Sequence, residues 1–157
     1  MKKARPALPP YHQSLAGSLL AAREAVMAPI RPILRNAGVT EQQWRVLRVL
    51  ADEKEIDLSR LAGRALLHGP SVTRILRELV DRKLVVRNAD PADGRRSVIG
   101  LSKAGHALLR STIPHSARLL AAYRETFGAE RLAALVAELQ ALSQAISVFT
   151  SPEYSGD

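Results

Sequence analysis

The sequence predicts a mainly α-helical protein with one small β-hairpin, and three observations support this. Apolar residues recur every three or four positions through most of the chain, which is typical of helices that bury one face. Two short β-like runs, 84–87 and 97–101, flank a segment rich in turn-forming residues. The length of 157 residues fits one domain, or two small lobes that share a core.

Charge and composition narrow the function. The chain holds 23 Lys and Arg against 15 Asp and Glu, a net charge of +8, and residues 59–105 alone carry ten basic and four acidic side chains. Clustered cations bind phosphates by releasing counterions, so we expect a nucleic-acid partner for this middle segment. The absence of cysteine excludes disulfides and thiolate chemistry. No apolar run approaches the roughly 18 residues that a membrane helix needs, so we expect a cytosolic protein that does not bind a membrane.

The N-terminal third predicts an arm and two helices. Residues 1–11 contain three prolines and no helical period, which indicates a flexible arm. Helical spacing begins near Ser14, and Pro29 predicts a kink or an early stop near Ala28. The Thr40–Gln43 segment has the pattern of a capping box, so a buried helix is predicted over 40–51.

The middle of the chain predicts two short helices and a hairpin. Asp57 is placed to cap a helix whose apolar residues run to Leu66, and Pro70 is expected to be the first residue of the next helix. The apolar residues of that second helix form one stripe, so its other face is polar. Two short helices followed by a basic hairpin predict a winged helix-turn-helix, in which a helix enters the major groove of DNA.

The polar face of the second helix supplies the candidate DNA contacts. We expect the side chains Ser71, Thr73, Arg74 and Arg77 to contact DNA, with the hairpin arginines Arg95 and Arg96. The alternative for Arg74 and Arg77 is a solvated face that pairs with Glu78 and Asp81. Ser71 would then serve only as a cap, and Thr73 would simply be exposed.

The C-terminal third predicts two long helices. Ser102 is placed to cap the first, in which Pro114 predicts a bend. In the second helix, after Gly128, apolar residues recur at gaps of three and four, which indicates a helix that packs against a partner chain. Residues 150–157 are polar and are expected to form a loose tail.

The segment 90–105, Asp-Pro-Ala-Asp-Gly-Arg-Arg-Ser-Val-Ile-Gly-Leu-Ser-Lys-Ala-Gly, resembles the wing signature of MarR-type transcriptional regulators. Within that family, residues 20–25, 31–33 and 40–45 are similar to the HpaR branch, whose members control homoprotocatechuate (4-hydroxyphenylacetate) degradation. The resemblance implies an obligate homodimer on a pseudo-palindromic operator in double-stranded DNA. It also implies dimerisation helices at 12–36 and 102–149 around a DNA-binding lobe at 37–101.

The same resemblance implies roles for three residues of the wing, and it implies a class of ligand. Asp93 would be a structural partner of Arg95, and Arg96 would enter the minor groove. Family members often bind small aromatic acids in a crevice beside the DNA-binding lobe. A carboxylate needs a cation and its ring needs an apolar wall, so the candidate ligand residues are Arg23, Met27, Arg31, Trp44 and Arg48. Trp44 has the alternative of a core position, and Arg45 also lies on a helix that should border the crevice.

The sequence therefore predicts a mainly α fold with a small β-wing, made of a winged helix-turn-helix lobe and a helical dimerisation region. The predicted function is a homodimeric repressor of an aromatic catabolic operon whose DNA binding is relieved by an aromatic carboxylate or phenol. A ligand-independent architectural DNA-binding protein is the alternative. An enzyme, a metal site and a cofactor have no supporting motif.

Overall fold

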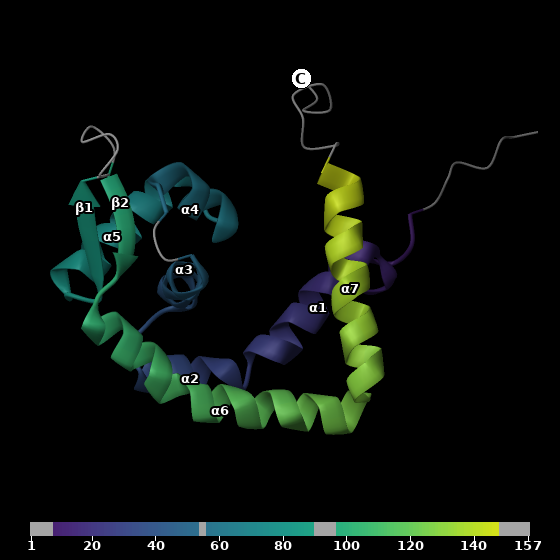
Figure 1. Ribbon diagram of the computed structural model, residues 1–157. Helices are drawn as coiled ribbons and strands as arrows, with labels where there is room; N and C mark the ends of the chain where they lie inside the picture. The colour runs from purple at the N-terminus through teal and green to yellow at the C-terminus, as the bar shows by residue number, and fades with distance from the viewer. Residues whose placement is uncertain (1–7, 54–55, 90–96, 148–157) are drawn as a thin grey trace, which may run out of the picture. The chain divides into compact units, whose positions relative to one another are not determined.

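The computed structural model describes residues 8–53, 56–89 and 97–147 (Figure 1). The chain divides into two compact units, Met1–Pro114 and His115–Asp157. The elements in chain order are the 3-10 turn η1 (Tyr11–Gln13), the helices α1 (Leu15–Met27), α2 (Ile30–Asn36), α3 (Glu41–Asp52), α4 (Leu58–Arg64) and α5 (Gly69–Asp81), the strands β1 (Val85–Ala89) and β2 (Ser97–Leu101), and the helices α6 (Lys103–Phe127) and α7 (Ala129–Ile146).

The helix starts follow from local capping. Thr40 accepts a hydrogen bond from the Gln43 backbone N–H at 3.1 Å, and the Gln43 side chain accepts one from the Thr40 N–H at 3.1 Å. The predicted capping box of α3 is thus confirmed. Asp57 caps α4 as predicted, by accepting from the Arg60 N–H at 2.9 Å. The predicted stop near Ala28 is also confirmed, because α1 ends at Met27 and α2 begins at Ile30.

Two details of the helix-turn-helix differ from the prediction. The sequence pattern places Leu66 on the apolar face of α4, but α4 ends at Arg64 and Leu66 lies in the turn with φ 52° and 80% of its surface exposed. Pro70 is the second residue of α5 rather than the first, and His68 occupies the N-cap position without a side-chain capping bond. The turn therefore begins and ends one or two residues earlier in the chain than predicted. Periodicity alone does not fix a helix boundary to the residue.

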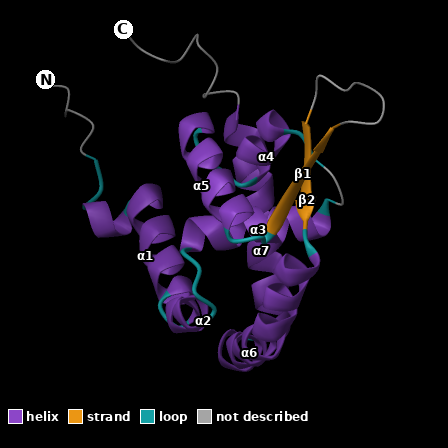
Figure 2. Ribbon diagram, turned by 90° about the vertical axis from the view of Figure 1, so that its left-hand side faces the viewer, coloured by secondary structure: helices purple, strands orange, loops and turns teal. Residues whose placement is uncertain are grey.

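The core of the first unit lies among α3, α4, α5 and the hairpin (Figure 2). The largest fully buried side chains are Val46, Leu47, Leu50, Ile56, Leu61, Val72, Ile75, Leu79, Val85 and Ile99. Burial of one such side chain stabilises the fold by about 1.5–3 kcal/mol, so this shared cluster holds the three helices and the hairpin together.

Besides its place in this core, the hairpin is tied to Ile56, between α3 and α4, and to the start of α6. β1 and β2 pair antiparallel, with Arg87 opposite Ile99, and Ile56 forms an isolated antiparallel bridge to Ile99. The sequence signals do not predict this bridge. At the base of the hairpin, the Ser102 hydroxyl donates to the Lys83 carbonyl at 2.6 Å and accepts from the Gly105 N–H at 3.0 Å. Ser102 therefore caps α6, as predicted, and also ties it to the hairpin.

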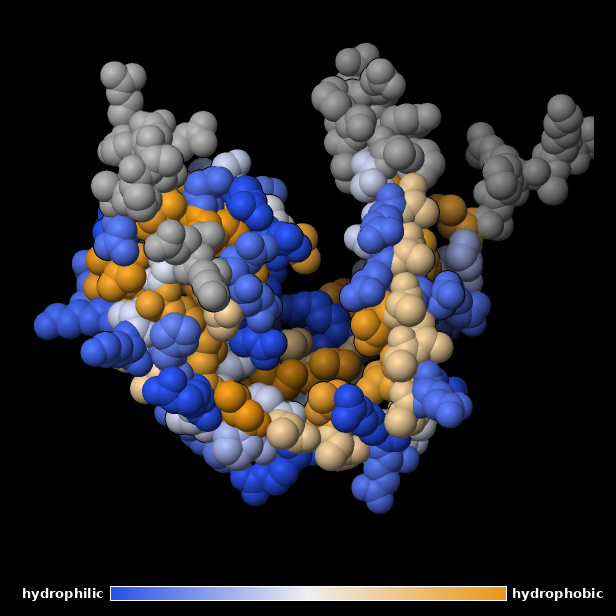
Figure 3. Space-filling view, viewed as in Figure 1, coloured by the Kyte–Doolittle hydropathy of each residue, from blue (hydrophilic) through white to orange (hydrophobic). Residues whose placement is uncertain are grey.

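The two C-terminal helices continue the chain from the hairpin. α6 extends through Pro114 as one helix, and Gly128, with φ 95°, separates it from α7. A continuous apolar strip runs along α7 (Figure 3). The exposed large apolar side chains of this helix are Leu135, Val136, Leu139 and Ile146. Among the described residues, no helix combines the length and the apolar character needed to cross a membrane.

Candidate nucleic-acid interface and effector site

Helix α5 has one buried face and one exposed face. Val72, Ile75 and Leu79 are at most 1% exposed, which fixes the rotation of the helix against the core. Three predicted contact residues, Thr73, Arg74 and Arg77, are exposed on the other side, and the fourth, Ser71, is half-buried. A polar helix face held by an apolar one is the arrangement that fits the major groove of B-DNA.

Arg74 has a partner on its own helix. Its guanidinium NH1 donates to Glu78 Oε1 at 3.2 Å, as the salt-bridging alternative predicts. The two side chains are 68% and 41% exposed, and exposed pairs of this kind contribute only about 0.3–0.5 kcal/mol. Such a pair leaves Arg74 available to DNA. The Thr73 hydroxyl donates back to the Gly69 carbonyl at 3.2 Å, which leaves its oxygen free to accept.

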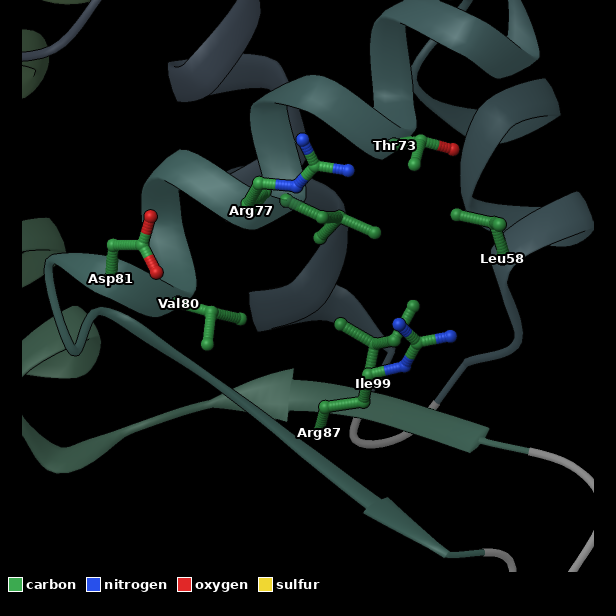
Figure 4. Close-up of a pocket in the computed structure, with 8 residues that line it drawn as sticks. Leu58, Thr73, Arg77, Val80, Asp81, Arg87 and Ile99 are labelled. Atoms are coloured by element: carbon green, nitrogen blue, oxygen red, sulfur yellow. The ribbon is translucent and has the colours of Figure 1, made fainter.

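A hollow of about 230 Å³ lies between α5 and the hairpin (Figure 4). Apolar side chains from α4, α5 and β2 form part of its lining, and the polar residues around it are Thr73, Arg77, Asp81 and Arg87. Arg77 comes from α5 and Arg87 comes from β1 on the opposite side. The hollow therefore joins the exposed face of α5 to the base of the hairpin.

Arg87 is absent from the contact residues that the sequence predicts. The alternation of side chains along a strand could have predicted it. Residues two apart point to the same face, and Arg87 lies two positions after Val85, which is buried. Its register partner Ile99 is buried as well, so Arg87 lies on the side of the hairpin that faces the helices. The wing residues Asp93, Arg95 and Arg96 lie outside the described residues, and their roles remain predictions.

Two of the predicted effector residues are part of an ion-pair ring. Arg23 contacts Glu24 at 2.7 Å and Glu41 at 2.6 Å, and Arg31 contacts the same two carboxylates at 2.7 Å and 2.5 Å. This ring of Arg23, Glu24, Arg31 and Glu41 links α1, α2 and the first turn of α3. The hydrogen bond from Arg31 is the main reason that the pKa of Glu41 lies below its ordinary value, and the same bond raises the pKa of Arg31.

The other candidates lie along the next turns of α3. Arg48 stacks over the Trp44 ring at 5.8 Å from its centroid, and Trp44 and Met27 are partly buried against the core. Glu41, Trp44 and Arg48 share one face of α3, since their spacing of three and four matches the helical turn. Trp44 thus has one side in the core and one cation beside it.

Arg45 lies apart from this group. Its NH1 donates to the carbonyls of Ala65 and Leu66, at 3.1 and 3.3 Å, at the end of α4. Arg45, on the helix that is expected to border the effector crevice, therefore places its guanidinium on the carbonyls at the end of α4.

A helix-turn-helix followed by a hairpin, with arginines on the exposed face of its second helix, defines a winged-helix DNA-binding protein. A model of the MarR family matches residues 37–96, which hold α3, α4, α5 and the first strand of the hairpin. The regulator FarR of Neisseria gonorrhoeae is 37% identical over 139 residues, a match that covers 87% of this chain and 95% of FarR. The chain belongs to the MarR family of transcriptional regulators, and its homologues are regulators rather than enzymes.

Two further relatives confirm the predicted branch of the family. The homoprotocatechuate degradative operon repressor of Escherichia coli is 44% identical over 97 residues, covering 62% of this chain and 66% of the repressor. A crystal structure of NadR in complex with 4-hydroxyphenylacetate is 35% identical, covers 87% of this chain and 97% of that chain, and superposes with a TM-score of 0.77. The predicted winged-helix fold is likewise confirmed.

Proposed function

We propose that this MarR-family protein is a cytoplasmic homodimer that represses an aromatic catabolic operon and leaves its operator when a small aromatic acid binds. The observation that carries the DNA-binding part is the exposed face of α5, where Thr73, Arg74 and Arg77 stand opposite a fully buried stripe. Arg87 extends that cationic surface onto the hairpin. Arg95 and Arg96 would continue it along the wing.

The dimer is supported by the apolar surface of α7. Leu135, Val136, Leu139 and Ile146 are each 39–47% exposed in the single chain. Burial of apolar surface is the main favourable term in protein association, and a second copy of α7 would supply it. Two copies would then present two α5 helices to the two halves of a pseudo-palindromic operator.

The effector is proposed from chemistry and from the relatives. NadR has been solved with 4-hydroxyphenylacetate, and the Escherichia coli relative is a repressor of homoprotocatechuate degradation. In this chain Trp44 supplies a flat wall and Arg48 a cation beside it. Arg23 and Arg31 are already bound by two carboxylates, so an incoming acid would compete with Glu24 and Glu41 for them. Met27 would contribute apolar contact.

The test is a reciprocal titration. Trp44 is the only tryptophan of the chain, so its fluorescence reports binding of 4-hydroxyphenylacetate directly. We expect saturable binding that weakens when a duplex selected by the protein from a random pool is present, and the acid should weaken duplex binding by the same factor. The uncharged 4-hydroxyphenylacetamide is the control, because it lacks the carboxylate.

The alternatives predict other outcomes. Duplex binding that no phenolic acid weakens would favour the ligand-independent architectural protein. Arg48→Ala should lower the affinity for 4-hydroxyphenylacetate without lowering the affinity for the duplex. An unchanged affinity for the acid would show that Arg48 does not contact it.

Arg74 is the residue that we expect to read a base. Arg74→Ala should cost about 1–3 kcal/mol of duplex affinity and relax the preference at one base pair in each half-site. Competition between the selected duplex and its single-base-pair variants measures both effects. Equal affinities of Arg74→Ala and the unmodified protein for every duplex would exclude this role.

A further inference from the structure

A chain of hydrogen bonds joins the first turn of α3 to the exposed face of α5. The Gln43 side-chain NH₂ donates to Glu78 Oε2 at 2.9 Å, and the Arg74 guanidinium donates to Glu78 Oε1 at 3.2 Å. Glu78 thus uses one carboxylate oxygen for each neighbour. Gln43 is one of the few buried polar residues in the described part of the chain, with 7% of its surface exposed.

The orientation of the Gln43 amide is determined by its other partners. Its Oε1 accepts from the Thr40 backbone N–H at 3.1 Å and from Arg82 NH1 at 3.4 Å. Both partners can only donate, so the amide oxygen must face them and the NH₂ must face Glu78. Gln43 therefore combines two tasks, because it completes the capping box of α3 and fixes a carboxylate on the neighbouring helix.

This anchor changes the character of the Arg74–Glu78 pair. An exposed pair on one helix is usually weak, because both long side chains must give up rotamer freedom to form it. Here Glu78 is already held from α3, so only Arg74 has to be ordered. A guanidinium has five N–H donors, so Arg74 can donate one to Glu78 and still donate others to the acceptor atoms of a base edge.

We propose that Glu78, fixed by Gln43, is the positioning residue of Arg74, and that this pair is a determinant of the base that α5 prefers. The proposal rests on the proposed DNA contact of Arg74. Glu78 and Gln43 do not touch DNA in this proposal; they restrict the directions in which the Arg74 guanidinium can point. A recognition side chain held in one direction discriminates between bases better than a loose one.

Three variants separate the hydrogen-bond pattern from charge and folding. Gln43 and Arg74 donate to different oxygens of Glu78, so Glu78→Gln, which replaces one of these oxygens with an NH₂ group, sets one of the two donors against another donor. Gln43→Glu keeps the capping box but sets two carboxylates against each other. In the double variant Gln43→Glu/Glu78→Gln, the carboxylate introduced at position 43 would again accept from the Thr40 N–H and from the amide introduced at position 78, whose oxygen is then free for Arg74. The double variant therefore restores every bond, with the donor and acceptor exchanged between the two helices.

The experiment measures base preference rather than affinity alone. The probes are a duplex selected by the unmodified protein from a random pool and all its single-base-pair variants, and Arg74→Ala first identifies the base pair that Arg74 reads. At that pair we expect each single variant to lose roughly three- to tenfold in discrimination, the range given by one hydrogen bond of ordinary net strength, and the double variant to recover it. Asp81→Asn, which removes an equal charge from the next turn, should leave the preference unchanged.

Other results would overturn the proposal. A uniform loss at all base pairs would show a merely structural role, and a thermal melt of each variant identifies one that has not folded. Unchanged discrimination in Glu78→Gln, or no recovery in the double variant, would exclude the positioning role while the function of Arg74 stands. If Arg74→Ala alters no base pair, both the base-reading role and this proposal fail.

Discussion

Single residues decide how closely the elements approach, and Gly105 is the clearest case. A Cβ atom at Gly105 would lie 2.1 Å from the Leu84 carbonyl oxygen, so α6 meets the hairpin at a distance that only glycine allows. This gives a physical reason for the glycine at the end of the segment that resembles the MarR wing signature.

We predict that Gly105→Ala lowers the free energy of unfolding by about 1–3 kcal/mol, the usual cost of overpacking, because the backbone of either element must move. Urea denaturation followed by circular dichroism measures it. Gly63→Ala in α4 is the matched control, since nothing lies within 4 Å of its Cβ position and a helical alanine should be neutral or stabilising. Equal stability of Gly105→Ala and the unmodified protein would contradict the close approach.

Glu41 makes the ion-pair ring sensitive to acid. Its pKa is lowered in the folded chain, chiefly by the Arg31 hydrogen bond, so the ionised form is the one that stabilises the fold. The stabilisation is complete above the ordinary pKa of 4.5 and is lost as the pH falls through the lower folded value.

We therefore predict that the melting temperature of the unmodified protein falls more steeply below pH 4.5 than that of Glu41→Gln, which cannot titrate. In Arg31→Met the melting temperature should also fall less steeply below pH 4.5, because this variant lacks the hydrogen bond that mainly lowers the pKa of Glu41. Melting curves between neutral pH and the acid limit of solubility measure this. If the melting temperature falls in parallel with pH in all three proteins, ionisation of Glu41 does not contribute to the stability of the fold.

At the scale of elements, the turn between α4 and α5 carries strain that a substitution can relieve. Leu66 has φ 52°, in the left-handed region where a side chain costs about 1–2 kcal/mol, and it buries little apolar surface in return. Arg45 holds this turn through the carbonyls of Ala65 and Leu66.

Leu66→Gly should consequently raise the free energy of unfolding by roughly 0.5–1 kcal/mol, since glycine adopts this conformation without the steric cost. Leu67→Gly is the comparison, because Leu67 packs partly against the core and the same change there should lower the stability. Equilibrium denaturation distinguishes the two. A loss of stability in Leu66→Gly would mean that the side chain makes a contact, for example with a second chain.

The elements themselves are largely predictable from sequence, because their ends are marked by local chemistry. The capping residues Thr40, Asp57 and Ser102 and the breaker Gly128 all act within a few residues of themselves. The site is predictable only in part. Helical spacing places Arg74 and Arg77 on one face, but the Glu78–Gln43 bond and the Ile56 bridge join residues far apart in the chain, which periodicity does not reveal.

The ion-pair ring shows the same limit for the effector candidates. The sequence offers Arg23 and Arg31 as cations for an acid, and the residue types are suitable. That the chain supplies its own carboxylates from Glu24 and Glu41 depends on how α1, α2 and α3 fold together. Charge counts along a sequence cannot tell a free cation from a paired one.

At the scale of the whole molecule, the exposed apolar side of α7 is the feature that a single chain leaves unexplained. The apolar residues of α7 recur at gaps of three and four, and Leu139→Glu places a charge among them. We predict that this variant is a monomer or an unfolded chain instead of a dimer. Gln140→Glu adds the same charge beside the series and should remain dimeric. Sedimentation equilibrium gives the mass of each, and a dimer of Leu139→Glu with unchanged affinity would place the interface elsewhere.

The most direct measurement of the proposed function is the number of chains on one operator. Native mass spectrometry of the protein with a selected duplex, before and after addition of 4-hydroxyphenylacetate, counts chains and DNA in the same spectrum. We expect two chains on one duplex, and free two-chain protein with released duplex once the acid is added. One chain per duplex, or binding without sequence preference, would contradict a dimeric repressor that reads DNA through its two α5 helices.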